Sequence, residues 1–408
     1  MSKIVKCLAV FTIATILVLP GCFGGGSDIR IGTILPLTGD LSAYGPGMQE
    51  GVELAVKQIN KAGGVLGKDI VLVSEDSETS GNAAVGAMNK LVNIDKVIAF
   101  IGAAGSGVSK AIIDIAIDNE VVQVSPSNTG TDFTSYDDND FYYRTCPTDA
   151  LQGKAMAKIA FQSYATASTI SINNDYGVGF EEVFVNEFEA LGGVVLDKVR
   201  YDPGAQTFDA EVTDVSSGNP DVIVLIGYPD TGSQILRKAY EMGVMDDSGW
   251  LLSEGLRDET LAESTGTDDD GNYIIAGMTG TTPDPRAAVT EYNKFIIDYQ
   301  DEYNKEPVTF VPNSYDAMVL LALAIEKAGE ASGPAIKSAI RDVANAPGEE
   351  VSDVAKALEL LREGKDINYQ GVSGELTIDE NGDVYGTYCV WQIGTDGSIE
   401  LGDAIDIE

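Results

Sequence analysis

The chain has 408 residues, 44% of them apolar, which is enough for two domains with separate hydrophobic cores. Its 64 acidic and 26 basic side chains give a net charge of −38, which argues against binding to nucleic acid and against adhesion to anionic membrane surfaces. There is no histidine, so the usual general base, the commonest transition-metal ligand and every Ser-His or Cys-His pair are missing. We therefore expect neither an enzyme nor a resident cofactor.

The N-terminus has the pattern of an export signal. Two lysines precede an apolar run at residues 8–19, which is too short to span a bilayer. The sequence "LPGC" then resembles a lipobox, in which the cysteine becomes the lipidated first residue of the mature chain, although Pro20 is unusual at its position. We expect a signal peptide at 1–21, a lipid anchor on Cys22 and a flexible glycine-rich tether at 22–27. An uncleaved anchor helix is the alternative, and both place the globular part outside the membrane.

Strands and helices alternate through the first third of the chain. Apolar runs predict strands, and apolar residues three or four apart predict the helices between them. The strands are expected at 29–37, 69–74, 96–102 and 120–125, and the helices at 48–62, 81–93 and 108–116. This alternation is typical of a parallel sheet that is covered by helices on both faces.

The same alternation restarts after residue 146 and predicts a second α/β lobe. Strands are expected at 168–173, 193–201, 221–227 and 250–255, and helices at 152–164, 181–191 and 233–242. Residues 264–272 have the composition of a surface turn, 283–330 return to helices, and 371–394 predict a β-hairpin that turns about residues 380–382. The fold class is therefore α/β, with two doubly wound parallel-sheet lobes.

Small polar and aromatic residues follow six of the predicted strands. Ligands of open parallel sheets bind beyond the carboxyl ends of the strands, where backbone N–H groups and helix N-termini point. The candidate ligand-binding residues at these ends are Tyr44, Ser106, Ser127, Asn128, Thr129, Tyr176, Tyr228 and Glu254. No single residue carries this prediction, and their shared location at strand ends is the evidence for a binding site.

Each candidate also has a simpler structural explanation. Ser106 could cap its helix, Thr129 could satisfy a turn, and Glu254 could be a solvated acid. Other motifs are incomplete: "GAAGSG" lacks the dinucleotide-binding spacing, no phosphate-binding G-K-[ST] occurs, and "DENGDVYG" lacks the glycine that a calcium loop needs. No spacing predicts a zinc site, so no metal is expected.

Several of these stretches together resemble the branched-chain amino acid binding proteins of ABC transporters, which are type I periplasmic binding proteins. They are "IGTILPLTGDLSAYGPGMQEGVELAVKQINKAGGVLGKDIVLV", "VSPSNT", "NNDYGVGF" and "SEG". The resemblance implies two lobes joined by a three-crossover hinge, with residues 28–146 and 280–388 in lobe 1 and residues 147–279 and 389–408 in lobe 2. It also implies a lipid-anchored protein at the cell surface or in the periplasm, which delivers an amino acid to a permease.

The resemblance also implies roles for the candidate residues. Hydroxyls of Ser106 and Thr129 would hold the ligand's α-carboxylate. The Ser127 carbonyl, the Thr129 hydroxyl and Glu254 would hold its α-ammonium, since a buried zwitterion needs partners for both charges. The three tyrosines would enclose its side chain. The sequence departs from the best-known family members at one place. Those members have a disulfide in the first lobe with one cysteine beside the serine loop, whereas this chain has Gly105 in that loop.

The two remaining cysteines are a disulfide candidate. Cys146 in "YRTCPTD" and Cys389 in "YCVWQI" match the first and third crossovers of the family, and exported proteins form disulfides. The resemblance thus implies a bond between adjacent hinge strands. Two buried free thiols are the alternative.

The ligand and the partner remain open at this stage. The same fold serves polar amino acids, amides, urea and aromatic acids, whereas Glu254 favours an amine, and tyrosine walls favour a neutral side chain. A sensory module that signals to a partner is one alternative function. A hydrolase that uses serine or aspartate without histidine is another.

Overall fold

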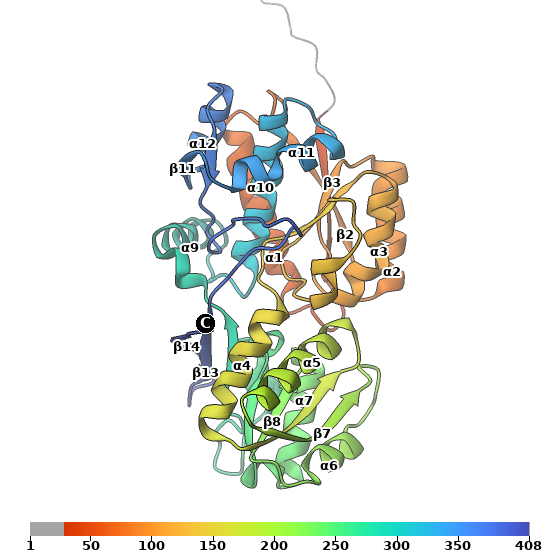
Figure 1. Ribbon diagram of the computed structural model, residues 1–408, viewed down its shortest axis with the longest axis vertical. Helices are drawn as coiled ribbons and strands as arrows, with labels where there is room; N and C mark the ends of the chain where they lie inside the picture. Colours follow the sequence, from red (N-terminus) through yellow and green to blue (C-terminus); the bar gives the residue numbers. More distant parts are fainter. Residues whose placement is uncertain (1–27, 408) are drawn as a thin grey trace, which may run out of the picture.

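Two separate β-sheets form the cores of two lobes, one above the other in Figure 1. The structure is a computed structural model that describes residues 28–407. The predicted signal peptide, Cys22 and the tether lie outside the described residues. Within residues 28–407 no helix combines the length and apolar character that a membrane span needs.

The sheet of lobe 1 is parallel and has the strand order β2-β1-β3-β4-β5. Its strands are β1 (Ile29–Leu35), β2 (Ile70–Asp76), β3 (Ala99–Gly102), β4 (Val122–Ser125) and β5 (Tyr142–Arg144). The order reverses direction after β1, because β3 and β4 lie on the other side of β1 from β2. Such a reversal leaves a crevice at the carboxyl ends of the strands, where ligands of this architecture bind.

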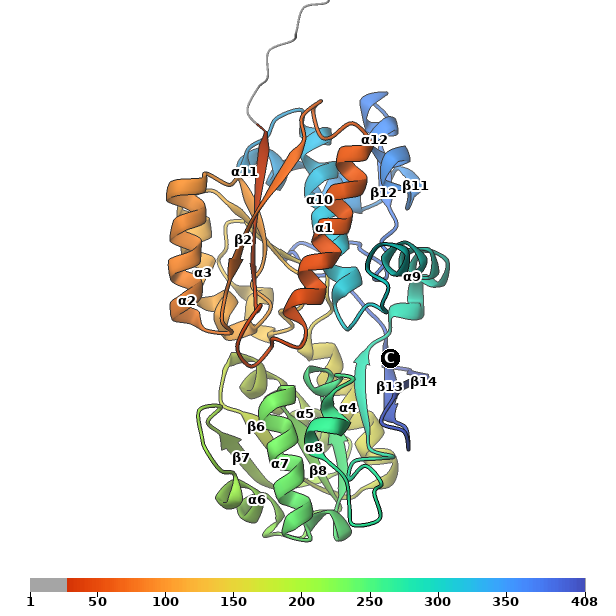
Figure 2. The ribbon, with the colours of Figure 1, turned by 180° about the vertical axis from the view of Figure 1, so that it is seen from behind.

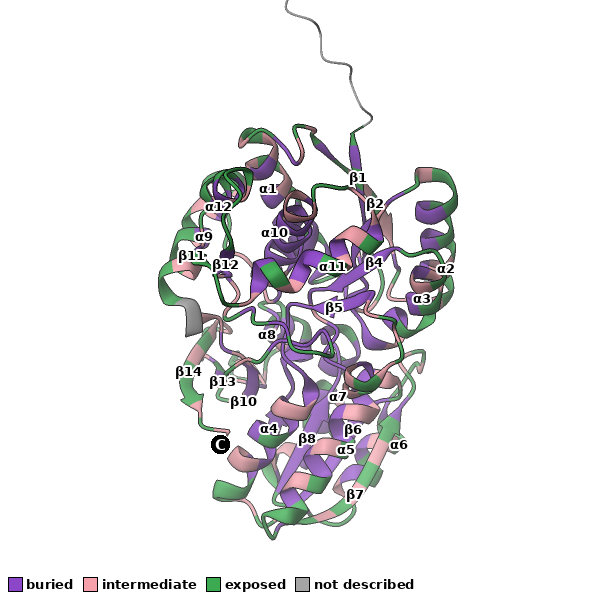
Figure 3. Cartoon of the chain, turned by 45° about the horizontal axis from the view of Figure 1, so that its top comes forward, coloured by how far each residue is buried: buried purple, intermediate pink, exposed green. Residues whose placement is uncertain are grey.

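Helices cover both faces of this sheet, as the apolar pattern predicts. They are α1 (Gly45–Lys61), α2 (Gly81–Lys90), α3 (Ser106–Asp118), α10 (Val311–Ala328), α11 (Gly333–Ala344) and α12 (Val354–Arg362). Neighbouring residues of β3 point to opposite faces: Phe100 packs with α2 and α3, whereas Ile101 belongs to the core formed with α1 and α10. The central helix α10 is buried along most of its length (Figure 3).

The sheet of lobe 2 has seven strands in the order β14-β13-β10-β9-β8-β6-β7. The strands are β6 (Thr166–Ile172), β7 (Val194–Tyr201), β8 (Val222–Ile226), β9 (Gly249–Leu252), β10 (Thr279–Pro283), β13 (Tyr388–Ile393) and β14 (Ile399–Ile405). The five from β10 to β7 are parallel, and the β13–β14 hairpin adds two antiparallel strands at the edge. The doubly wound fold that the sequence predicts is therefore confirmed for both lobes.

The helices of lobe 2 also lie on both faces of its sheet. They are α4 (Asp149–Ser163), α5 (Asp175–Ala190), α6 (Asp209–Ser216), α7 (Pro229–Glu241) and α8 (Leu261–Thr265). Helices α4 and α5 cover the face seen in Figure 1, and α7 and α8 cover the face seen from behind in Figure 2. The surface turn predicted at 264–272 is confirmed only after residue 265, because residues 264 and 265 end α8; the Asp268 carboxylate accepts the backbone N–H groups of Asp270 and Asn272.

The chain crosses between the lobes three times, as the family resemblance implies. It leaves lobe 1 after β5, returns after β10 towards α9 (Val289–Tyr303), and crosses again into β13. The second crossing follows Pro283, so the predicted lobe boundary after residue 279 falls inside β10. The predicted boundary at 388/389 likewise falls at the start of β13.

The C-terminal hairpin lies later in the chain than predicted. The turn at 380–382 is flanked only by the single β-bridge Ile378–Val384, whereas the extended hairpin is formed by β13 and β14. The Asp379 carboxylate accepts the N–H groups of Asn381 and Asp383 and folds the earlier segment into a tight turn. Two short strands, β11 (Glu349–Val351) and β12 (Ile367–Tyr369), and the helices α11 and α12 occupy the stretch after residue 330 that the periodicity left unassigned.

Candidate ligand-binding site

A narrow cleft separates the carboxyl ends of the two sheets and brings most of the predicted residues together. The cavity between its walls is small, about 30 Å³, because the two walls lie close together. Seven of the eight predicted residues line it, and only Asn128 does not. The lining consists of Leu41, Tyr44, Met48, Ala104, Gly105, Ser106, Ser127, Thr129, Tyr176, Tyr228, Glu254, Gly255 and Phe310.

Two loops of lobe 1 form the hydroxyl-bearing wall. β3 ends at Gly102, and two observations require glycine there. Its φ is +127°, and a Cβ added at this position would lie 2.2 Å from the backbone oxygen of Ile34. The Ser125 hydroxyl donates to the Ala103 carbonyl at 2.7 Å and accepts the Asn128 N–H at 2.9 Å. Ser125 therefore joins the loop after β3 to the loop after β4 and fixes their relative position.

Ser106 lies at the mouth of α3 but does not cap the helix. The capping position is occupied by Gly105, without a side-chain hydrogen bond, and Ser106 is the first residue of the helix. The backbone N–H groups of a first helical turn have no partner within the helix and attract anions. The simpler explanation of Ser106 as a cap is thus not supported, and its hydroxyl lies beside helix N–H groups in the cleft lining.

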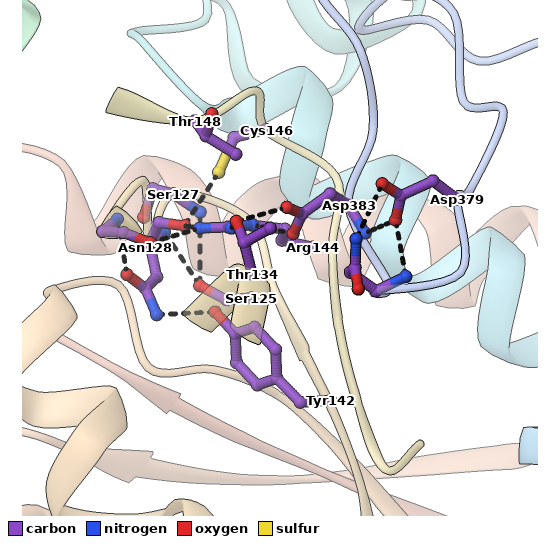
Figure 4. A network of polar contacts seen from close by, with 12 residues as sticks. Ser125, Ser127, Asn128, Thr134, Tyr142, Arg144, Cys146, Thr148, Asp379 and Asp383 are labelled. Atoms are coloured by element: carbon purple, nitrogen blue, oxygen red, sulfur yellow. Dashed lines mark hydrogen bonds and ion pairs between the residues drawn. The ribbon is translucent and has the colours of Figure 1, made fainter. Parts of the chain in front are cut away.

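Asn128 is the one predicted ligand residue that turns away from the cleft, so its predicted role is wrong. Its amide nitrogen donates to the Tyr142 hydroxyl at 2.5 Å, and its side-chain oxygen accepts the Gly130 N–H at 3.1 Å (Figure 4). Ser127 and Thr129, the residues before and after it, both line the cleft. Thr129 faces the cleft, and its neighbour Asn128 therefore stabilises the loop from behind.

Aromatic rings from lobe 2 close the opposite wall. Tyr176 in the first turn of α5 and Tyr228 at the cap of α7 stack with ring centroids 5.5 Å apart and an interplanar angle of 11°. From lobe 1, the Tyr44 hydroxyl donates to the Gly255 carbonyl at 3.1 Å and so bridges the two lobes. At the rim, Lys110 of α3 pairs with Asp132 at 3.0 Å and with Asp175 of α5 at 2.7 Å. These contacts define a closed arrangement.

Glu254 supplies a buried negative charge to the cleft. It follows β9, and only 3% of its surface is exposed. Its carboxylate accepts a hydrogen bond from the Gln152 side-chain amide at 2.7 Å. Burial raises the pKa of Glu254 to about 7, although the Gln152 amide and the nearby Tyr176 hydroxyl, which favour the ionised form, oppose the shift. The simpler explanation of Glu254 as a solvated acid is therefore wrong.

A second buried acid, Asp149, lies next to Glu254 and was missed by sequence reasoning. It is the first residue of α4 and is fully buried, and its backbone N–H donates to the Thr129 carbonyl at 2.8 Å. Neither carboxylate oxygen has a partner at hydrogen-bonding geometry within residues 28–407. Burial, and then the charge of Glu254, raises the pKa of Asp149 well above its usual range, although the nearby Thr129 side chain opposes the shift. Two neighbouring buried carboxyls favour a cationic ligand group between the lobes.

Apolar side chains complete the lining. Leu41, Met48 and Phe310 come from lobe 1 and face the tyrosine rings, and Glu254 is the only residue with a formal charge in the described lining. Met48 fits the spacing of the apolar core residues along α1, so this spacing did not indicate that Met48 lines the cleft. The arrangement can hold a small molecule that carries one cationic group, one anionic group and an uncharged remainder.

The predicted disulfide is wrong, because both Cys146 and Cys389 are free and buried. The Cys146 thiol donates to the Asn128 carbonyl at 3.4 Å in lobe 1. On β13, Tyr388 reaches towards the first crossover and donates to the Thr148 carbonyl at 3.0 Å. Since successive strand residues point to opposite faces, Cys389 points away from Cys146.

Known proteins resemble the chain over nearly its whole length. Residues 47–396 match the family described as "Receptor family ligand binding region". The Leu/Ile/Val-binding protein BraC3 of Rhizobium johnstonii is 30% identical over 360 residues, which cover 88% of this chain and 89% of that protein. The chemotactic signal transduction system substrate-binding protein BasB of Halobacterium salinarum is 28% identical over 391 residues, which cover 93% and 90%. The crystal structure of the leucine binding protein LivK from Thermotoga maritima matches with a TM-score of 0.79 and 31% identity, covering 93% of this chain and 99% of that one.

Proposed function

The chain belongs to the receptor ligand-binding family and is a type I periplasmic binding protein, and from this membership we propose that it captures a branched-chain amino acid and delivers it to an ABC permease. Its relatives and structural neighbours are named as binding proteins of transporters or receptors, in agreement with the prediction that it is not an enzyme. The ligand, the permease and the lipid anchor at Cys22 are parts of the proposal.

The observation that carries the proposal is the pairing of buried acids with hydroxyls across one cleft. Glu254 and Asp149 are both buried, and Glu254 shares the cleft with Ser106, Ser127 and Thr129. An α-ammonium would offset the charge of one ionised carboxyl of this pair, while hydroxyls and helix N–H groups would receive an α-carboxylate. A plain aromatic acid or urea would leave the buried carboxyls without a counter-charge, which costs free energy.

The remaining walls favour a neutral aliphatic side chain. Leu41, Met48 and Phe310 present carbon atoms, and the stacked tyrosines present ring faces. A charged ligand side chain would be desolvated there without a partner. The wall chemistry therefore supports leucine, isoleucine or valine over basic or acidic amino acids.

The position of the N-terminus is compatible with a lipid anchor. The cleft lies at the carboxyl ends of the parallel strands of lobe 1, so β1 starts at Ile29 at the opposite end of that lobe. An anchor at Cys22 would then be joined to the end of the protein far from the cleft. The ligand entrance would stay accessible to solvent and to a permease.

Thermal unfolding with a panel of amino acids tests the ligand assignment. A ligand that binds only the folded protein stabilises it by about 2.7 kcal/mol at one hundred times its dissociation constant. We expect leucine, isoleucine and valine to raise the melting temperature of the purified protein, and 4-methylpentanoate, which is leucine without its amine, to have a much smaller effect. Stabilisation by an amide, by urea or by an aromatic acid, with no response to amino acids, would contradict the proposal.

Signalling is the second candidate, and the similarity to a chemotactic substrate-binding protein favours it. The same closed, liganded form would then be read by a membrane receptor instead of a permease. Disruption of the gene separates the two functions. Loss of uptake of labelled leucine supports transport, whereas intact uptake with lost attraction to leucine supports signalling.

A further inference from the structure

A fully buried arginine, Arg144, stands behind the hydroxyl-bearing loop of the cleft. It is the last residue of β5, and its side chain is 0% exposed. Its guanidinium donates to the carbonyls of Asn128 at 3.2 Å and Gly130 at 2.8 Å (Figure 4). It also donates to the Thr134 hydroxyl at 2.9 Å and to the Asp383 carboxylate at 2.5 Å. Only an arginine offers donors in a rigid fork that reaches all four acceptors.

These contacts determine how the ligand loop faces the cleft. The carbonyls of Asn128 and Gly130 point to Arg144, while the carbonyl between them, that of Thr129, accepts the N–H of Asp149 at 2.8 Å on the other side. The backbone on both sides of Thr129 is therefore held from two directions. This leaves the Thr129 side chain in the lining of the cleft, together with Ser127.

The same arginine also ties the loop to the hinge. Arg144 directly precedes the first crossover, and Asp383 precedes the third crossover, which enters β13. Asp383 is held in turn by the Thr134 hydroxyl at 2.6 Å, and its N–H donates to the Asp379 carboxylate at 2.9 Å. One buried ion pair thus connects the ligand loop with two of the three segments that join the lobes.

We propose that Arg144 is a positioning residue, which holds the loop at 127–130 in its ligand-ready conformation and couples that loop to the first and third hinge crossovers. The assignment of ligand groups to this loop rests on the proposed function, whereas the rigidity of the loop does not. A loop fixed before binding loses less conformational entropy when the ligand arrives. Arg144 itself lies behind the loop and outside the cleft lining.

Arg144→Lys is the decisive variant, because it keeps the charge beside Asp383 but cannot reach four acceptors. Arg200→Lys is its matched control: Arg200 on β7 pairs with the buried Glu181 carboxylate at 2.8 Å, in lobe 2 and away from the loop. Two measurements apply to each variant. Hydrogen–deuterium exchange follows the peptide 125–131 without ligand, and calorimetry compares leucine with 4-methylpentanoate.

We expect exchange in this peptide to become at least tenfold faster in Arg144→Lys, and leucine affinity to fall at least tenfold. The preference for leucine over 4-methylpentanoate should fall too, because the proposed function assigns the Ser127 carbonyl and the Thr129 hydroxyl to the ammonium, which only leucine carries. Arg200→Lys should change none of these. Unchanged loop exchange, or an equal loss for both ligands, would overturn the positioning role.

Two further outcomes keep the test conclusive. If the wild-type protein binds no amino acid although loop exchange responds to Arg144→Lys, the proposed function fails and the positioning role stands. If Arg144→Lys does not fold, Asp383→Asn is tested in its place. This variant keeps Arg144 and its contacts with the loop carbonyls, and it removes the negative charge of the Arg144–Asp383 ion pair. Loop exchange should then rise at least threefold, and an unchanged rate would overturn the coupling to the third crossover.

Discussion

Replacing the buried cleft acid, Glu254→Gln, should have opposite effects on ligand affinity and on the stability of the ligand-free protein. The substitution keeps the shape of the side chain and removes its charge. Loss of one partner from a buried, hydrogen-bonded charge pair costs about 2–5 kcal/mol in binding. Because Asp149 retains a carboxyl next to the site, we expect the lower part of this range, about 2–3 kcal/mol, or a loss of leucine affinity of about 30- to 150-fold.

The ligand-free protein should respond in the other direction. A pKa raised from 4.5 to about 7 means that the ionised Glu254 is less favourable in the folded than in the unfolded chain. The cost is absent below pH 4.5, grows between pH 4.5 and 7, and reaches about 3 kcal/mol above pH 7. Glutamine removes this cost, so Glu254→Gln should raise the free energy of unfolding at pH 8 by up to about 3 kcal/mol and leave it nearly unchanged at pH 4.

Two assays check this pair of effects. Isothermal calorimetry gives the leucine affinity, and urea unfolding at pH 8 and pH 4 gives the stability. Glu263→Gln, an exposed acid on α8 outside the cleft, is the matched control and should change neither. Unchanged affinity in Glu254→Gln would refute the role of the carboxylate as counter-charge. A loss of stability at pH 8 would refute the reasoning that burial of this carboxylate is unfavourable without ligand.

Three further predictions follow from the cleft, its rim and the thiols. The pKa values of Glu254 and Asp149 are raised, and an ammonium ligand favours the ionised forms of both carboxyls, so binding should release a proton near pH 6. Leucine affinity should therefore rise between pH 5 and 8, by up to about tenfold per pH unit. Calorimetry in buffers of different ionisation enthalpy measures the proton release, and an affinity that does not change with pH would contradict the prediction. Lys110→Met removes an ion pair that joins the lobes, so leucine affinity should fall about two- to fivefold in low salt and much less in 0.5 M salt. The control Lys356→Met breaks an ion pair within α12 and should not change the affinity. Equal affinities of the two variants would show that the Lys110–Asp175 pair does not favour closure. Burial raises the pKa values of the Cys146 and Cys389 thiols, so both should resist alkylation in the native protein. Both should be alkylated after denaturation without reductant, because both are free. Mass spectrometry that finds neither cysteine alkylated in the denatured protein would support the disulfide instead.

The fold could be predicted because its two periodicities are strong. Buried parallel strands appear as short apolar runs, and the helices between them carry apolar residues on one or two faces. The weak signals were the short elements: β11 and β12 have three residues each, too few for a period to show. The hairpin was misplaced because a glycine turn at 380–382 predicts the local reversal of the chain, but not which flanking segments find a partner strand.

The site was predictable as a location and less so as a set of contacts. Parallel strands bring their carboxyl ends to one edge of each sheet, and the lobes place these two edges opposite each other, so Ser106 and Glu254 meet in the cleft. Asn128 and Thr129 are indistinguishable by composition, and only the alternation of the backbone decides which one faces the ligand. Asp149 resembles an ordinary acid in the first turn of a helix, and its burial follows from the packing of α4 against the lobe 1 loop.

The order of segments along the chain has a consequence for how the protein is made. Helix α1 packs against α10 in the core of lobe 1, although all of lobe 2 except β13 and β14 lies between them in sequence. The first lobe to be synthesised therefore cannot bury its main apolar face until residue 328 has emerged from the ribosome. Most of the lobe 2 sheet, from β6 to β10, is contiguous in the chain, so the first lobe can complete its core only after most of the second has been made.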